Sequence, residues 1–114
     1  MLKVYASYFV SYLLGNLKNA GNIQKIILFG SISRDEGAKD SDIDIFIEAK
    51  KKTKKFRNEI KQIEEKFYQS REASLFKVKG IEYKFDINIG VLKEWNDFHS
   101  SIASTGIVLY GNYE

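Results

Sequence analysis

The chain has 114 residues, of which 44% are hydrophobic and 29% are charged, and its formal net charge is +3. This length is typical of one domain, so we expect a single domain over residues 1–114 with no room for a second catalytic domain. The lack of cysteine excludes a disulfide scaffold and any cysteine-ligated zinc or iron-sulfur site. No apolar run approaches the ~20 residues of a membrane helix. We therefore expect a cytoplasmic protein that does not enter a membrane.

The first half of the chain predicts one helix and two strands. Residues 2–18 carry apolar side chains at helical spacing, and turn-forming residues follow them. Residues 23–29 form a short β-branched run, typical of a strand that is buried on both faces. Residues 31–41 are polar and predict a short helical turn and a loop. A second strand is expected over residues 43–47.

The second half predicts a helix, a strand and a further helix. Residues 53–68 have apolar side chains on one helical face, namely Phe56, Ile60, Ile63 and Phe67. Residues 81–91 alternate in polarity, which predicts a third strand with Asp86 and Asn88 on its polar face. A last helix is expected around Trp95, Phe98 and Ile102, followed by a short apolar tail over residues 107–110. The order predicts a small α/β (α+β) fold in which helices flank a mixed sheet.

Positive charge is concentrated in one short stretch after the second predicted strand. It consists of Lys50, Lys51, Lys52, Lys54, Lys55 and Arg57. Such a run can attract a phosphate-bearing partner. Surface lysines need no partner, however. We interpret the run as a solvated turn and do not expect nucleic acid to be the partner.

Chemistry is indicated where the first predicted strand ends at Gly30 and Ser31. A glycine allows the backbone to approach a ligand closely, and the turn after it offers N–H groups and a hydroxyl to phosphate oxygens. A glycine-serine pair alone is a weak signal. After ten intervening residues come Asp42 and Asp44, which are two positions apart, so their carboxylates project from the same face of the second strand.

Two adjacent carboxylates on a largely buried strand repel each other unless a cation lies between them. Mg²⁺ and Mn²⁺ prefer such hard oxygen ligands and hold nucleotide phosphates through them. A turn aspartate followed by an exposed strand position would explain the pair without a metal.

The glycine-serine pair, the spacing and the Asp-x-Asp motif together resemble the minimal nucleotidyltransferases of the DNA polymerase β superfamily. The resemblance implies the polymerase-β-type nucleotidyltransferase fold and assigns roles by position. Gly30 and Ser31 match the residues that grip the nucleoside triphosphate, and Asp42 and Asp44 match two metal-binding catalytic carboxylates. Arg34 is a further candidate for nucleotide binding, although an arginine that caps a turn would explain it equally well.

The third carboxylate of the family lies in a later strand, and Asp86 is the matching residue. Asp86 is also the only other aspartate in the middle of a strongly apolar predicted strand, where an unpaired charge is costly. A salt bridge to a lysine across the sheet is the alternative. One position departs from the family pattern, because Asp35 stands where a small residue is common. Its negative charge near a triphosphate would weaken nucleotide binding.

The resemblance implies a metal-dependent transfer of AMP from ATP to an acceptor, with Mg²⁺ or Mn²⁺ as cofactor. Minimal members of the family are similar to the antitoxin of a two-gene system that modifies a HEPN-type ribonuclease toxin. We therefore expect a helical HEPN-type partner protein that supplies the acceptor hydroxyl. A free-standing enzyme that modifies a small molecule and a non-catalytic module that binds nucleotide or partner remain the alternatives. Homo-oligomerisation, the acceptor and the nucleotide preference stay open.

Overall fold

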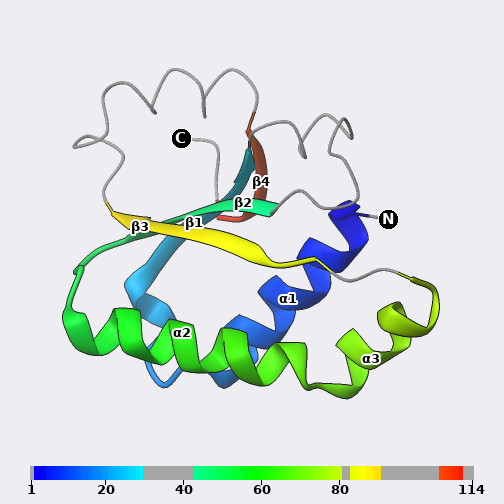
Figure 1. Cartoon of the computed structure of the whole chain (residues 1–114). Helices are drawn as coiled ribbons and strands as arrows, with labels where there is room; N and C mark the ends of the chain where they lie inside the picture. Colours follow the sequence, from blue (N-terminus) through cyan, green and yellow to red (C-terminus); the bar gives the residue numbers. More distant parts are fainter. Residues whose placement is uncertain (1, 30–42, 81–82, 91–105, 112–114) are drawn as a thin grey trace.

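The structure is a computed structural model that describes residues 2–29, 43–80, 83–90 and 106–111. Its strands form a four-stranded sheet in the order β3-β2-β1-β4. Helices pack against one face of this sheet (Figure 1). The elements are α1 (Leu2–Asn16), the short 3₁₀ helix η1 (Ala20–Asn22), β1 (Ile23–Phe29), β2 (Ile43–Ala49), α2 (Lys54–Tyr68), α3 (Arg71–Val78), β3 (Phe85–Gly90) and β4 (Ile107–Tyr110).

The sheet is mixed, as predicted. β2 pairs antiparallel with β1 and parallel with β3, and β4 pairs antiparallel with β1 on the other side. The predicted α+β class with a small mixed sheet and flanking helices is therefore confirmed. The parallel pairing requires the chain to cross over between β2 and β3, and helices α2 and α3 make this crossover.

The best-predicted elements are those with the strongest periodic patterns. β1 has the predicted bounds, and β2 runs two residues beyond its predicted end. Helix α2 begins one residue after the predicted start, because Thr53 caps it: the Thr53 hydroxyl accepts a hydrogen bond of 3.1 Å from the Phe56 N–H. Helix α1 ends at Asn16, two residues before its predicted end.

Helix α3 was not predicted, although its sequence carries weak start and stop signals. The Ser70 hydroxyl accepts a hydrogen bond of 3.2 Å from the Ala73 N–H and so caps the helix. Gly80 then follows with a φ of 78° and donates a hydrogen bond of 2.9 Å to the Lys77 carbonyl. Glycine adopts this left-handed conformation without a steric cost, which makes it a common helix terminator.

The last two strands differ from their predictions. β3 begins at Phe85, so Tyr83 and Lys84 precede it, and the Tyr83 carbonyl accepts a hydrogen bond of 3.2 Å from the Tyr5 hydroxyl of helix α1. The predicted tail over residues 107–110 is a strand, because it pairs with β1. The predicted turn and loop over residues 31–41 and the predicted last helix lie outside the described residues.

The main hydrophobic core lies between the sheet and the helices. Strand residues such as Ile26, Ile45 and Ile47 are fully buried there against Phe9 of α1 and Phe67 of α2. The basic stretch is exposed at Lys50, Lys51, Lys52, Lys54, Lys55 and Arg57, as the interpretation as a solvated segment requires. In the described part of the chain, no helix is long and apolar enough to span a membrane.

The opposite face of the sheet carries a second, smaller apolar cluster. Ile27 and Phe29 of β1 and Phe46 of β2 are buried there, with Val108 of β4 packed against them. The two clusters arise because successive side chains of a strand point to opposite faces. Polar side chains of β2 and β3 that point away from the helices therefore lie beside an apolar cluster.

The core makes a first prediction about stability. Phe67 is fully buried, so Phe67→Ala should lower the free energy of unfolding by about 3 to 5 kcal/mol, because it leaves a cavity among packed rings. Leu75→Ala is the control, since Leu75 is 62% exposed and its replacement should change the free energy by no more than about 0.5 kcal/mol. Urea unfolding monitored by circular dichroism measures both; equal effects would contradict the assignment of the core.

Candidate active site

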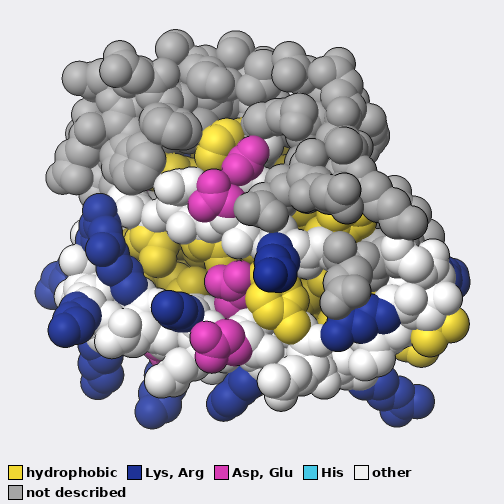
Figure 2. All heavy atoms as spheres, in the orientation of Figure 1, with side chains coloured by type: hydrophobic (Ala, Val, Ile, Leu, Met, Phe, Trp, Pro, Cys, Tyr) yellow, Lys and Arg dark blue, Asp and Glu magenta, His cyan; other side chains and the backbone are white. Residues whose placement is uncertain are grey.

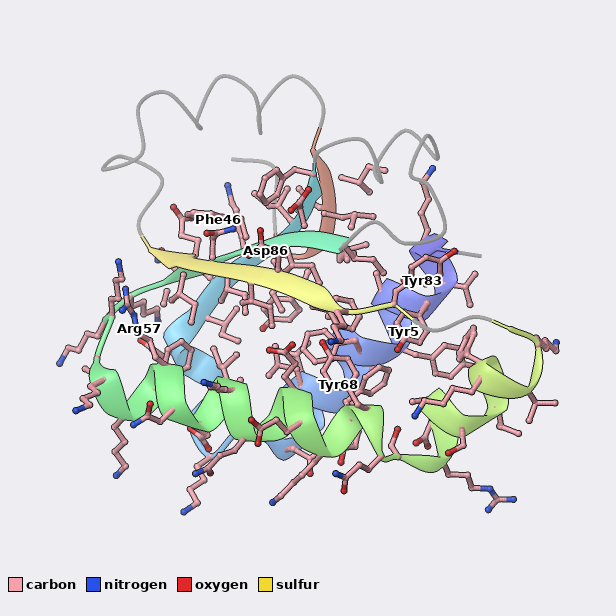
Figure 3. All side chains as sticks on the ribbon, in the orientation of Figure 1. Tyr5, Phe46, Arg57, Tyr68, Tyr83 and Asp86 are labelled. Atoms are coloured by element: carbon pink, nitrogen blue, oxygen red, sulfur yellow. The ribbon has the colours of Figure 1, made fainter. Side chains whose placement is uncertain are left out.

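Two of the predicted carboxylates lie side by side on the sheet. Asp44 of β2 and Asp86 of β3 are direct partners in the parallel register. Neighbouring strands are about 4.8 Å apart, and paired residues point to the same face of a sheet. Figure 3 shows Asp86 on the side of the sheet away from the helices, together with Phe46. The register therefore brings together two residues that are far apart in the sequence.

The two carboxylates differ in their exposure. Asp44 is half-buried, and Ile43 and Ile45 on either side of it are fully buried. Asp86 is exposed, because β3 is the edge strand of the described sheet. Asp86 was expected in the middle of a strongly apolar strand, where an unpaired charge is costly; in the structure it is the second residue of β3 and its side chain is exposed, so this cost does not arise. Its pairing with Asp44, rather than a cost of burial, is what singles it out.

The end of β1 lies next to Asp44. Phe29, the last residue of β1, pairs with Asp44, so Phe29, Asp44 and Asp86 form one row across three strands. The remaining predicted site residues and the departure from the family pattern lie outside the described residues: Gly30, Ser31, Arg34, Asp35 and Asp42. Gly30 and Ser31 follow Phe29 directly in the chain.

The start of β3 is held by side chains that the sequence did not single out. The Tyr68 hydroxyl, at the end of α2, accepts a hydrogen bond of 2.9 Å from the Phe85 N–H. It also donates a hydrogen bond of 2.5 Å to Glu64 Oε2, one helical turn earlier. Glu64 and Tyr68 are four residues apart, which places them on one helix face. The contact between Tyr68 and Phe85 depends on how helix α2 packs against the sheet, and no sequence pattern predicts it.

Burial shifts the protonation of this pair. It raises the pKa of Glu64 above its ordinary value of 4.5, and the negative charges of Glu65 and Asp86 add to the rise, while the Tyr68 hydrogen bond and Lys61 oppose it. Burial and the hydrogen bond to Glu64 also raise the pKa of the Tyr68 hydroxyl. The Tyr68 hydroxyl therefore stays protonated and can donate its hydrogen bond to Glu64.

The paired carboxylates fit a divalent cation. Two carboxylates at neighbouring positions repel each other, and a cation between them removes this cost. Asp44 and Asp86 could supply hard oxygen ligands to Mg²⁺ or Mn²⁺, which use one or two carboxylates together with substrate phosphates. Within the described residues no group of three or more His, Cys, Asp or Glu side chains forms a metal site. The described part thus supplies two candidate ligands.

Comparison with known protein families decides the family of the chain. Residues 13–114 match the family described as "Polymerase beta, Nucleotidyltransferase". The chain belongs to this family. The resemblance inferred from the glycine-serine and Asp-x-Asp residues is therefore confirmed, and the mixed sheet with its flanking helices is consistent with the family's fold. A search of curated proteins finds no match.

Solved structures of toxin-antitoxin complexes are similar in fold. A complex crystallised with AMP-PNP matches with 21% identity and a TM-score of 0.58, over 93% of this chain and 73% of that chain. A complex of a tri-AMPylated HEPN toxin with an MNT antitoxin from Shewanella oneidensis matches with 18% identity and a TM-score of 0.55, over 98% and 74%. A variant of an MntA-HpeT toxin-antitoxin matches with 17% identity and a TM-score of 0.62, over 92% and 72%. At these identities the likeness establishes the fold.

Removal of either paired carboxylate should weaken metal binding. We expect Asp44→Asn and Asp86→Asn each to lower the affinity for Mn²⁺ by at least about tenfold, because each removes a charged ligand. Without metal the variants should be as stable as the wild type or more stable, since the like-charge repulsion is gone. Mn²⁺ titration followed by electron paramagnetic resonance, together with urea unfolding, measures both effects. Unchanged Mn²⁺ affinity in both variants would rule out this metal site.

Glu64 should make stability depend on pH in a defined direction. Because its pKa is raised in the folded state, the folded protein holds this proton more tightly than the unfolded chain does. The free energy of unfolding should therefore fall as pH rises above about 4.5. Glu64→Gln removes this contribution while it keeps an acceptor for Tyr68. Urea unfolding between about pH 4 and pH 7 should show wild type losing stability relative to the variant; a constant difference or the opposite slope would refute the assignment.

Proposed function

We propose that the chain is a metal-dependent nucleotidyltransferase that transfers AMP from ATP to a hydroxyl of a partner protein. The observation that carries the proposal is the pairing of Asp44 with Asp86 beside the end of β1, in a chain of the polymerase β nucleotidyltransferase family. Phosphoryl and nucleotidyl transfer depend mainly on positioning and on charge neutralisation. A pair of carboxylates on a rigid sheet provides both.

The residues divide the work between nucleotide and acceptor. Gly30, Ser31 and Arg34 hold the triphosphate after β1, because backbone N–H groups and a guanidinium are good phosphate donors. Asp42, Asp44 and Asp86 would hold Mg²⁺ or Mn²⁺. Bound divalent ions supply charge neutralisation for the triphosphate and activation of the acceptor hydroxyl. Asp42 is included because it is two positions before Asp44, a spacing that would place both carboxylates on one face of an extended strand.

In this proposal Asp86 is the residue that receives the proton. It is the exposed member of the pair and lies on the edge strand of the sheet that the described residues form. In the proposed reaction the acceptor oxygen forms a bond to the α-phosphorus of ATP. The bond from this phosphorus to the bridging oxygen breaks, and pyrophosphate leaves. The proton of the hydroxyl passes to a carboxylate oxygen of Asp86 and from there to solvent.

The partner is proposed to be a HEPN-type toxin, with this chain as its antitoxin. Two of the similar structures support this choice, because one is a toxin-antitoxin complex with AMP-PNP and the other contains an AMPylated HEPN toxin. Both are similar over more than nine tenths of this chain. The proposal predicts that the acceptor lies on another protein rather than on a small molecule.

Label transfer tests the proposal. The purified chain is incubated with Mg²⁺ or Mn²⁺, ATP labelled at the α-phosphate and an extract of the source cells. We expect one labelled protein band, and Asp44→Asn and Asp86→Asn should each reduce the labelling about a hundredfold or more, because charge stabilisation in the transition state is lost. Glu48→Gln is the matched control. Glu48 lies four residues after Asp44 on β2 and so on the same face of the strand, but it pairs with Gly90 rather than with an aspartate.

Each alternative gives a distinct result in the same assay. Label on small molecules without a protein band would replace the proposal by a free-standing enzyme. ATP binding that depends on Mg²⁺, with no transfer to any acceptor, would replace it by a non-catalytic binding module. Full activity in both aspartate variants would show that Asp44 and Asp86 are not the site.

A further inference from the structure

The row of residues across the sheet separates the side of the nucleotide from the side of the acceptor. Phe29, Asp44 and Asp86 lie in register on β1, β2 and β3, so Asp86 is the member nearest the open edge. Phe29 is the member at the other end, and the proposed triphosphate ligands Gly30 and Ser31 follow it in the sequence. An acceptor hydroxyl that meets Asp86 therefore approaches over the β3 edge.

A surface hollow lies along this strand on the helix side of the sheet, whereas Asp86 points to the opposite side. It has a volume of about 370 Å³ and lies between β3 and helix α2. Its apolar part consists of Ile60, Ile87 and Ile89, and Asn88 also contributes to the lining. Ile60 is buried, whereas Ile87 and Ile89 are only partly buried. Figure 2 shows apolar side chains here, bordered by basic and acidic ones. Ile87 and Asp86 are neighbours on β3 and point to opposite faces, so a segment paired along β3 would direct alternate side chains toward the hollow and toward Asp86.

The shape of the hollow suits an extended polypeptide. β3 is the edge strand of the described sheet, and an edge strand can align a further strand along its backbone. Ile87 and Ile89 point to the same face about 6.6 Å apart, which is the spacing of alternate side chains in a bound extended segment. A small molecule would use neither feature.

The charge of the hollow favours an acidic segment. Arg57 and Lys61 line it, both are exposed, and they are one helical turn apart on α2. Among the described residues of the lining, the third charged one is Glu64, whose carboxylate accepts the hydrogen bond from Tyr68 and whose pKa is raised by burial. Basic residues at this end of α2, such as Lys54 and Lys55, add to the positive potential.

We propose that the hollow between α2 and β3, lined by Arg57, Lys61, Ile87 and Ile89, docks an extended acidic segment of the partner protein that carries the acceptor hydroxyl. This inference rests on the proposed function, because it defines how the acceptor reaches Asp86. The segment lies along β3, its apolar side chains contact Ile87 and Ile89, and its carboxylates face Arg57 and Lys61. Docking thereby concentrates one hydroxyl next to Asp86.

Binding tests the docking site independently of catalysis. The probe is fluorescein-labelled poly(Glu,Tyr), an acidic polypeptide with hydroxyls, and fluorescence anisotropy reports its affinity for the full chain. We expect the double variant Arg57→Glu/Lys61→Glu to weaken binding at least about tenfold. The control Lys54→Glu/Lys55→Glu makes the same change of charge on the same helix, outside the lining of the hollow. It should weaken binding less than about threefold, an effect of long-range charge alone.

A further variant separates a specific site from general attraction. Ile89→Thr keeps a β-branched side chain on β3 but makes the hollow polar, and we expect it to weaken binding several-fold without a change in charge. Circular dichroism confirms that each variant is folded. Equal losses in the two double variants, or full affinity in Arg57→Glu/Lys61→Glu, would overturn the docking site. Absence of poly(Glu,Tyr) binding by the wild type would overturn it as well.

Transfer of label from ATP to the same polymer distinguishes this inference from the proposed function. If both hold, the wild type labels poly(Glu,Tyr) in preference to poly(Lys,Tyr), and Arg57→Glu/Lys61→Glu raises the KM for poly(Glu,Tyr) while kcat changes little. Binding that depends on Arg57 and Lys61 without transfer to polymer or extract would keep the docking site and reject the nucleotidyltransferase. Transfer of label with an unchanged KM in the double variant would support the nucleotidyltransferase and reject the docking site.

Discussion

Burial of the Phe85 ring against the helices holds the edge strand β3 in place, and with it the carboxylate that follows. The ring stacks on Phe9 with centroids 4.3 Å apart and on Tyr5 with centroids 5.5 Å apart. Phe67 meets it edge-on at 6.1 Å. Each such pair contributes about 0.5 to 1.5 kcal/mol beyond burial. Because side chains alternate along a strand, a ring packed toward the helices directs Asp86 to the opposite face, next to Asp44.

The backbone around Phe85 reinforces this placement. The Phe85 N–H donates to the Tyr68 hydroxyl, the Lys84 carbonyl accepts a hydrogen bond of 2.9 Å from the Ile43 N–H, and the Tyr83 carbonyl accepts one from Tyr5. Three consecutive residues are thus tied to α2, β2 and α1. A shift of β3 by one residue would break these bonds and turn Asp86 toward the core, where its charge is costly. Stability and the geometry of the carboxylate pair therefore depend on the same contacts.

Elements with a strong local sequence pattern are predicted correctly. Elements that form only through contacts with other parts of the chain are not. The apolar run of β1 and the helical stripe of Phe56, Ile60, Ile63 and Phe67 suffice for their elements. β4 has four residues, too few for a pattern, and becomes a strand only through its pairing with β1. α3 depends on the Ser70 cap rather than on a broad apolar face. For the site, Asp44 and Asp86 were predicted from the motif and the resemblance. Glu64 and Tyr68 were not, because the hydrogen bond between Tyr68 and Phe85 joins residues that are 17 positions apart and belongs to no motif.

The two faces of the sheet differ: one packs against the helices and stabilises the fold, and the other carries the candidate site. The helix side is packed with aromatic and aliphatic side chains, so it can hold the strands rigidly while the other face carries two adjacent negative charges. Asp44 is half-buried beside the apolar cluster of Ile27, Phe29 and Phe46, which strengthens its interaction with any bound cation because the local dielectric is low. Asp86 is open at the edge, where a macromolecular acceptor can reach it. The exposed position of Asp86 fits the proposed reaction, in which a partner protein paired along β3 would bring the acceptor hydroxyl to this carboxylate.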